Sequence, residues 1–306
     1  MSLFVPSSVA RARGPGVTAR GGTPRVGIFD SGVGGLTVAA AVRARMPALP
    51  LRYIADTAWF PYGGRPESEV EARSEALTRR LVDSGCDLVV VACNTASSAA
   101  LERLRERFDV PIVGMEPPLK PAAERTRSGR VVVLATEGTV KGARLERLNR
   151  LHGNGAHVDT IPMPGLAALV EAGEVDGPRI EAMLTAALAE PVAAGADAIA
   201  LGCTHYAFLR AVVERCAPGV EVLDTAEAIA RRVEHQLGER GFVIPEGPAL
   251  PVECTATGDT EALRTIIESL RTAGAALPVL EFPELQATER ETMAPAATGA
   301  DGGGQG

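Results

Sequence analysis

The chain has 306 residues, of which 46% are hydrophobic but only 4% aromatic, and it carries a formal net charge of −7. The length allows two domains of ordinary size. The acidic balance argues against a nucleic-acid partner, because phosphate binding needs a basic surface. No apolar run approaches the roughly 20 residues that span a membrane, so we expect a cytoplasmic protein with no membrane partner.

The five cysteines are odd in number and widely spaced, so they do not form a disulfide framework. No His/Cys cluster has the spacing of a zinc site, and we therefore expect reduced thiols and no metal. The cysteines are Cys86, Cys93, Cys203, Cys216 and Cys254.

Residues 1–24 are rich in Arg, Gly and Pro and contain no acidic residue. This composition is typical of a transit peptide or of a disordered extension. We favour the disordered extension, because the stretch has no apolar core and no cleavage-like signal.

The fold is expected to begin with a strand at 25–29, a glycine-rich loop at 30–35 and a helix at 36–45. This unit could bind a dinucleotide, with Asp56 after the next strand (51–55) contacting the ribose. The spacing is not G-x-G-x-x-G, however, and Asp30 would repel a pyrophosphate. The glycines suit a smaller ligand that approaches backbone N–H groups. Alternatively, Asp30 could merely cap the helix.

The pattern then alternates between helices and strands, which indicates a parallel sheet. Helices are predicted at 67–84 and 99–107, and strands at 88–92 and 111–114. The loop at 55–64 holds the only Trp, together with Tyr62 and Gly63. It is either a packed surface loop or a cover over a small polar ligand.

Residues 115–118 interrupt this pattern and predict a crossing into a second domain. Its expected strands lie at 130–135, 157–162, 198–202 and 221–224, and its helices at 140–152, 165–172 and 180–194. A helix at 226–237 leads back, and residues 250–284 should complete the first sheet. The predicted domains are therefore 25–115 plus 226–285, and 116–225, followed by a disordered tail at 286–306.

Two stretches of the chain, 88–95 and 198–205, are versions of one another. Each is a buried apolar strand that ends in a cysteine and small polar residues. The thiol then lies just past the carboxyl end of a strand, where open α/β sheets bind ligands. A lone buried cysteine is usually a small hydrophobe, but this repeat predicts that Cys93 and Cys203 face each other across one substrate.

A free thiol is mostly protonated at neutral pH, and a helix N-terminus or a nearby partner favours the thiolate. Both cysteines precede predicted helices, and each has a candidate helper, Asp30 for Cys93 and His205 for Cys203. A thiolate on one face of a carbon and a thiol on the other can invert a Cα centre by proton transfer.

Five motifs in this order resemble those of glutamate racemases, cofactor-independent enzymes that supply D-glutamate for bacterial peptidoglycan. The motifs lie at 27–36, 60–63, 91–97, 135–140 and 201–206, and the resemblance covers about residues 25–285. It implies an α/β fold of two similar open parallel-sheet, three-layer domains, related by a pseudo-dyad with the active site in the cleft between them.

The resemblance also implies roles for individual residues. Cys93 and Cys203 would transfer protons, Asp30 and His205 would assist them, and Glu171 would support Cys203. No cofactor is implied, the substrate would be glutamate, and we expect a homodimer. The implied substrate contacts are Asp30, Ser31, Tyr62, Gly63, Asn94, Thr95, Thr136, Thr139, Thr204 and His205.

Several alternatives stay open. Aspartate or a hydantoin could be the substrate, and a ligand-binding protein or a redox protein could use the same fold. A pyridoxal-phosphate racemase needs a Schiff-base lysine, and neither Lys120 nor Lys141 lies in a convincing cofactor site. The chain also departs from the family pattern at Ala207-Phe208, where Pro-Leu is common, and at Gly142, where Ser is common.

Overall fold

The computed structural model describes residues 22–283. The predicted extension at 1–24 therefore lies almost wholly outside the described residues, and the predicted tail at 286–306 lies entirely outside them.

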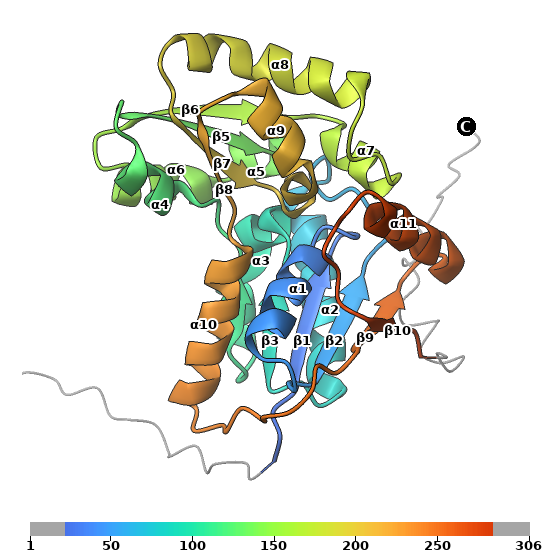
Figure 1. The fold of residues 1–306 in the computed structure, drawn as a ribbon. Helices are drawn as coiled ribbons and strands as arrows, with labels where there is room; N and C mark the ends of the chain where they lie inside the picture. The colour runs from blue at the N-terminus through green and yellow to red at the C-terminus, as the bar shows by residue number, and fades with distance from the viewer. Residues whose placement is uncertain (1–21, 284–306) are drawn as a thin grey trace, which may run out of the picture.

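The described chain forms two parallel sheets, which Figure 1 shows one above the other. The first has the strand order β10-β9-β2-β1-β3-β4 and the second the order β6-β5-β7-β8. The first sheet contains β1 (Val26–Asp30), β2 (Leu51–Ala55), β3 (Leu88–Val91), β4 (Ile112–Gly114), β9 (Val252–Ala256) and β10 (Leu280–Glu281). The second contains β5 (Arg130–Ala135), β6 (His157–Pro162), β7 (Ala198–Gly202) and β8 (Glu221–Leu223).

The central strands are buried on both faces, as expected for apolar runs in parallel sheets. Every residue of β1, β3 and β7 is buried. The predicted α/β class with parallel sheets is confirmed. The pseudo-dyad and the division into two domains stay predictions.

Helices cover both faces of the first sheet (Figure 1). They are α1 (Leu36–Arg45), α2 (Glu67–Asp83), α3 (Asn94–Arg107), α10 (Ala226–Glu239) and α11 (Thr260–Thr272). The apolar side chains of α1, α10 and α11 join one core cluster, and those of α2 and α3 join another. The first sheet is therefore the middle layer of three.

The second sheet is covered in the same way. Its helices are α4 (Leu119–Arg125), α5 (Glu137–Lys141), α6 (Ala143–His152), α7 (Leu166–Glu171), α8 (Pro178–Ala193), the 3₁₀ helix η1 (Thr204–Leu209) and α9 (Arg210–Cys216). Helices α4 and α6 contribute to one cluster, whereas α7, α8 and α9 join the cluster that also contains α1 and α10. A continuous apolar core thus connects the two sheets on one side.

Some elements differ from the prediction. The helix expected at 140–152 is two helices, α5 and α6, because Gly142 has an extended backbone. A Cβ at Gly142 would lie only 2.2 Å from Ser98 Oγ. Helix α3 begins at Asn94, five residues earlier than expected, because its first turn is polar and has no apolar periodicity. The short helices α4 and α9 were not predicted.

A buried ion pair lies at the end of β2. The Asp56 carboxylate is fully buried and receives hydrogen bonds from Arg73 Nε (2.8 Å), from the Tyr62 hydroxyl and from Thr257 Oγ1 (2.7 Å). These contacts connect β2 with α2 and with the chain that follows β9. Asp56 is thus committed to internal contacts, which removes the ribose role that the dinucleotide interpretation required.

This ion pair predicts a large effect on stability. Arg73→Leu leaves the Asp56 carboxylate buried without its cation, and we expect the free energy of unfolding in urea to fall by about 3–5 kcal/mol. The matched control is Arg150→Leu, because Arg150 pairs with Glu146 where both side chains are mostly exposed. That change should cost less than about 1 kcal/mol. Equal effects of the two substitutions would contradict the prediction.

Candidate active site

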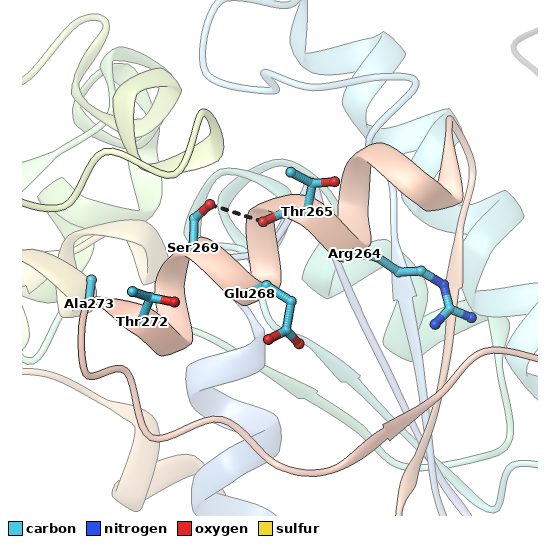
Figure 2. A pocket seen from close by; sticks show the side chains of 6 residues that line it. All are labelled: Arg264, Thr265, Glu268, Ser269, Thr272 and Ala273. Atoms are coloured by element: carbon cyan, nitrogen blue, oxygen red, sulfur yellow. Dashed lines mark hydrogen bonds between the residues drawn. The ribbon is translucent and has the colours of Figure 1, made fainter.

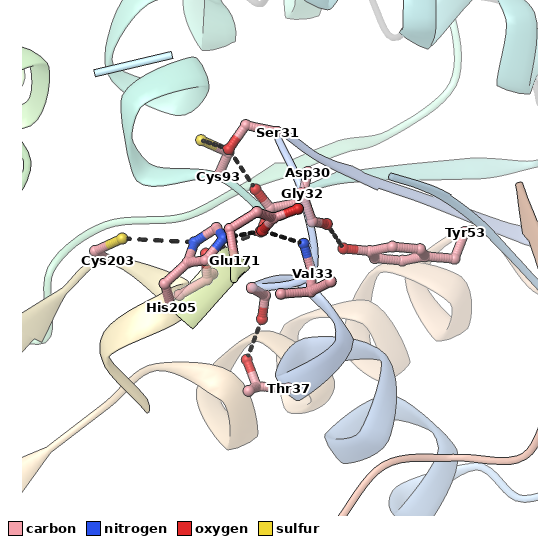
Figure 3. Close-up of polar contacts among 12 residues, drawn as sticks. Asp30, Ser31, Gly32, Val33, Thr37, Tyr53, Cys93, Glu171, Cys203 and His205 are labelled. Carbon is pink, nitrogen blue, oxygen red and sulfur yellow. Dashed lines mark hydrogen bonds and ion pairs between the residues drawn. The ribbon is translucent and has the colours of Figure 1, made fainter. Parts of the chain in front are cut away.

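The first part of the site is a chain of hydrogen bonds at the end of β1. Asp30 is fully buried, and its Oδ1 accepts a hydrogen bond from Ser31 Oγ at 3.0 Å. The Cys93 thiol in turn donates to Ser31 Oγ at 3.9 Å. Strands β1 and β3 are neighbours in register, which brings Asp30 and Cys93 to the same edge of the sheet. Ser31 therefore connects Cys93 to its predicted helper (Figure 3).

The second part follows β7. The Cys203 sulfur lies 3.9 Å from His205 Nδ1, and His205 Nε2 lies 2.7 Å from Glu171 Oε2. Glu171 ends α7, while Cys203 and His205 stand at the start of η1. Figure 3 shows the imidazole between the thiol and the carboxylate. The structure thus places Glu171, whose role only the resemblance implied, next to His205, the predicted helper of Cys203.

The glycine-rich loop after β1 joins the two parts. Thr204 Oγ1 donates to Asp30 Oδ2 at 2.8 Å, and Val33 N–H donates to Glu171 Oε2 at 3.0 Å. A Cβ at Gly32 would lie 2.2 Å from Glu171 Oε2. A Cβ at Gly34 would lie 2.4 Å from the Thr204 hydroxyl oxygen.

The glycines of this loop thus allow the close approach of the second half of the chain. That they also admit a small ligand stays a prediction. The capping role considered for Asp30 is wrong, because the N-cap of α1 is Gly35 and has no side-chain hydrogen bond.

A group of hydroxyls forms a further part of the site. Thr136 Oγ1 lies 2.8 Å from Thr95 Oγ1 and donates to Thr139 Oγ1 at 3.0 Å. A Cβ at Gly63 would lie 3.1 Å from the Thr136 side chain. Four predicted substrate contacts therefore lie together, namely Gly63 and Thr95 from the first half and Thr136 and Thr139 from the second. Tyr62 differs, because it is buried and its hydroxyl donates to Asp56.

Asn94 is the clearest sign that the site takes a polar ligand. Its side chain is 4% exposed, and neither its amide oxygen nor its amide nitrogen has a partner among the described residues. An unpaired buried polar group costs about 1–3 kcal/mol. The Glu171 Oε1 atom is likewise buried without a described partner. A ligand with both donors and acceptors would satisfy these atoms.

The acidity of Cys93 differs from the prediction. Burial and the negative charge of Asp30 raise the pKa of the Cys93 thiol well above its ordinary value, and a charge at Cys203 adds to this rise. Cys93 precedes a helix, as expected, and is the N-cap of α3, but desolvation outweighs the favourable effect of the helix N-terminus. Burial also raises the pKa of Asp30, and the charge of His205 and the bonds from Thr204 and Ser31 oppose that rise only in part.

For the pKa of His205, hydrogen bonds outweigh burial. Burial alone would lower the pKa of His205, but its hydrogen bonds to Cys203 and Glu171 raise that pKa well above the ordinary value. The imidazolium is therefore the favoured form, with a proton on each ring nitrogen. The two thiols thus have different surroundings, an anion near Cys93 and a cation beside Cys203.

Other features of residues 22–283 do not compete with this site. No group of three or more His, Cys, Asp or Glu in this range could hold a metal ion. None of the helices in the same range is long and apolar enough to cross a membrane. An open depression, which Figure 2 shows, is lined by a single helix and has no cysteine or histidine among its lining residues. Its lining residues are Arg264, Thr265, Glu268, Ser269, Thr272 and Ala273.

The sequence did not predict three contacts of the site. Tyr53 donates a hydrogen bond to the Gly32 carbonyl at 2.6 Å, and Val33 contributes only its backbone N–H. The Phe60 ring packs against the imidazole of His205. Phe60 lies inside one of the motifs, but nothing in that motif indicates which side chain it meets.

Comparison with known proteins gives consistent matches. The sequence profile of the Asp/Glu/hydantoin racemase family matches residues 36–233. The glutamate racemase of Pseudomonas aeruginosa is 44% identical over 228 residues, which cover 74% of this chain and 86% of that protein. The glutamate racemase of Herpetosiphon aurantiacus is 42% identical over 235 residues, covering 76% and 92%.

Solved structures agree with these matches. Glutamate racemase from Thermus thermophilus, in complex with β-chloro-D-alanine, has a TM-score of 0.71 and 36% identity over 86% of this chain and 98% of that chain. Escherichia coli glutamate racemase, with L-glutamate and the activator UDP-MurNAc-Ala, has a TM-score of 0.72 and 32% identity over 85% and 98%.

The close approach at Gly34 predicts a cost for one added methyl group. Gly34→Ala places a Cβ against Thr204 and His205, so we expect it to lower the free energy of unfolding by about 1–3 kcal/mol. Gly64→Ala is the matched control, since nothing lies within 4 Å of a Cβ there. Urea denaturation measures both, and a Gly34→Ala protein as stable as the control would refute the close approach.

Proposed function

This chain belongs to the Asp/Glu/hydantoin racemase family and is a cofactor-independent amino-acid racemase, an isomerase; on this basis we propose that it interconverts L- and D-glutamate by proton transfer at Cα between Cys93 and Cys203. The observation that carries the proposal is that two buried thiols from separate sheets, Cys93 and Cys203, each have their own polar partners, and that a hydrogen bond from Thr204 to Asp30 joins these partners. The unpartnered Asn94 beside Cys93 supports a polar substrate at the same place.

The proposed reaction needs one base and one acid. The thiolate of one cysteine removes the Cα proton, and the electron pair of the C–H bond stays on the substrate as a carbanion. The thiol of the other cysteine then donates its proton to the opposite face. The first cysteine ends as a thiol and the second as a thiolate, so the enzyme is ready for the reverse reaction.

The surroundings of the two thiols differ. Burial and the charge of Asp30 raise the pKa of the Cys93 thiol, whereas the Cys203 sulfur lies beside His205, whose pKa is raised by its contacts with Cys203 and Glu171. We therefore infer that Cys93 rests as a thiol. Glu171 would keep His205 charged, and Ser31 would connect Cys93 to Asp30 when the roles exchange.

The polar groups around the thiols fit an amino acid with a second carboxylate. The amide of Asn94 can donate to the substrate α-carboxylate, where carbanion charge spreads during the reaction. The hydroxyls of Thr95, Thr136 and Thr139 can bind a side-chain carboxylate without bringing a full positive charge. Asp30 and Thr204 would face the ammonium group. Tyr62 would contribute through the backbone beside Gly63, because its hydroxyl is engaged by Asp56.

Glutamate is favoured over aspartate by the relatives, since both solved structures compared above are of glutamate racemases and share 32–36% of their residues with this chain. A racemisation assay with both amino acids separates the two substrates. A role in supplying D-glutamate for peptidoglycan, a cytoplasmic location and a homodimer stay predictions.

The two-base mechanism predicts matched defects in two variants. Cys93→Ser and Cys203→Ser should each lower the rate of glutamate racemisation by about 100-fold or more, because each removes one of two proton-transfer groups. Each variant should still exchange the Cα hydrogen of one enantiomer with deuterated solvent, and the two variants should act on opposite enantiomers. Proton NMR of each enantiomer in D₂O measures the exchange.

Cys216→Ser is the matched control, because Cys216 lies on α9 and contacts Thr185 and the Glu181 backbone. It should racemise glutamate at the wild-type rate. Two active variants at Cys93 and Cys203 would exclude the two-base mechanism.

The anion beside Cys93 predicts how its acidity responds to mutation. Asp30→Asn removes the negative charge that disfavours the Cys93 thiolate, so the pKa of Cys93 should fall by about one unit or more. At a fixed pH below that pKa, the thiolate fraction and the rate of iodoacetamide alkylation at Cys93 should then rise about tenfold. Mass spectrometry of the Cys93 peptide measures the rate. Asp109→Asn, at an exposed carboxylate, should leave it unchanged, and an unchanged rate in Asp30→Asn would contradict the assignment.

A further inference from the structure

The aromatic ring of Phe60 touches a residue of the site from the other half of the chain. The ring centroids of Phe60 and His205 are 5.5 Å apart, with an angle of 45° between the planes. This is the range of favourable aromatic pairs. Phe60 follows β2 in the first half, whereas His205 follows β7 in the second half. The pair therefore connects a loop of one sheet to the imidazole beside Cys203.

The loop that carries Phe60 is firmly anchored on both sides of it. Before Phe60, Trp59 N–H donates to the Asp56 carbonyl at 3.0 Å, and Ala58 N–H donates to Thr257 Oγ1 at 3.1 Å. After Phe60, the Tyr62 hydroxyl donates to the buried Asp56 carboxylate.

Two cations add to this anchor. The guanidinium of Arg65 lies 4.6 Å from the centroid of the Trp59 ring and that of Arg73 lies 5.3 Å from it. Arg65 Nε also donates to the Trp59 carbonyl at 2.9 Å. Because Arg73 is itself ion-paired with Asp56, the buried pair, the indole and the backbone form one unit. Phe60 projects from a rigid support, so its ring can restrain a neighbour.

The polar contacts of His205 leave one motion of its ring weakly restrained. Its short contact is at one end, 2.7 Å from Nε2 to Glu171, and its contact with the Cys203 sulfur is long, at 3.9 Å. An imidazole held mainly by one nitrogen can tilt about that contact, except on the side of Gly34, where an added Cβ would lie 2.5 Å from Nδ1. The charged and titratable groups that act on it are Cys203, Glu171 and Asp30, and its contacts with Cys203 and Glu171 are at the two ring nitrogens.

We propose that Phe60 is a positioning residue for His205, whose ring face it supports so that Nδ1 stays directed at Cys203 while Nε2 stays on Glu171. The consequence for catalysis rests on the proposed racemase function. Phe60 has no described contact with Cys93, so it acts on only one of the two proton transfers. The buried Asp56–Arg73 pair then contributes to that transfer indirectly, by fixing the loop.

The direct test observes the imidazole itself. His205 is one of four histidines, and its ring signals in an NMR spectrum can be assigned with the variant His205→Asn. We expect a single sharp set of His205 ring signals in the wild-type protein. In Phe60→Ala these signals should broaden or double, because the ring samples more than one orientation.

The matched control is Phe108→Ala. Like Phe60, Phe108 is a half-buried phenylalanine of the first half. It lies at the far end of α3, with the Arg79 guanidinium over its ring. It should leave the His205 signals unchanged. Phe60→Tyr, which keeps the ring, should retain the sharp signals. Should Phe60→Ala fail to fold, Phe60→Leu removes the flat ring with less loss of volume and takes its place.

Kinetics then test the consequence. In Phe60→Ala we expect kcat for glutamate to fall about tenfold or more and KM to change less than threefold, with Phe60→Tyr within threefold of the wild-type kcat. With glutamate deuterated at Cα, the isotope effect should rise for only one enantiomer, the one that Cys203 deprotonates. A merely structural defect would not separate the two directions.

The outcomes are distinguishable. A wild-type protein that does not racemise glutamate refutes the proposed function, and the NMR comparison still decides the role of Phe60. Unchanged His205 signals in Phe60→Ala, or isotope effects that rise equally for both enantiomers, would overturn the positioning role.

Discussion

The site depends on the close contact between the loop after β1 and the polar residues that follow β7. At this contact Thr204 donates to the buried Asp30, and the Val33 backbone donates to Glu171. Gly32 and Gly34 have no side chain, and any Cβ there would collide with Glu171 or with Thr204 and His205. The glycines therefore allow two sheets, each with one thiol at a strand end, to form a single site.

The same contact makes the two thiols chemically unequal. Asp30 places a negative charge near Cys93, which raises the pKa of that thiol. On the other side, Glu171 and Cys203 together raise the pKa of His205, which keeps a positive charge next to Cys203. A racemase accepts both enantiomers of a chiral substrate. Its two thiols can therefore have different helpers, because the α-carboxylate and the ammonium group lie on different sides of the site.

Much of this arrangement could be predicted from the sequence. The apolar runs that end in Cys93 and Cys203 predicted two buried strands and their parallel sheets, because a strand buried on both faces has a recognisable composition. The elements with weak patterns were missed or misplaced, such as α9 and the break at Gly142, where the backbone is extended and lies close to the distant Ser98 side chain. The pKa of Cys93 was predicted in the wrong direction, because the sequence does not show that burial and the charge of Asp30 outweigh the favourable effect of the helix N-terminus.

Residues that act through long-range contacts could not be predicted from the sequence either. Phe60 belongs to a recognised motif, but its contact with His205 joins residues 145 positions apart and exists only once both sheets are in place. The Asp56–Arg73 pair was likewise hidden, since Asp56 had been considered only as a ribose ligand. Such contacts depend on the packing of the whole chain, whereas strand composition is local.

The most direct test of the two-base site follows the wild-type enzyme in D₂O, starting from L-glutamate with protium at Cα. Two thiols on opposite faces remove the protium and deliver a solvent-derived deuteron. At early conversion, D-glutamate should therefore carry deuterium at Cα while the remaining L-glutamate keeps protium. If the early D-glutamate retained the original protium, one group would have moved the proton between faces, and the two-thiol mechanism would be wrong.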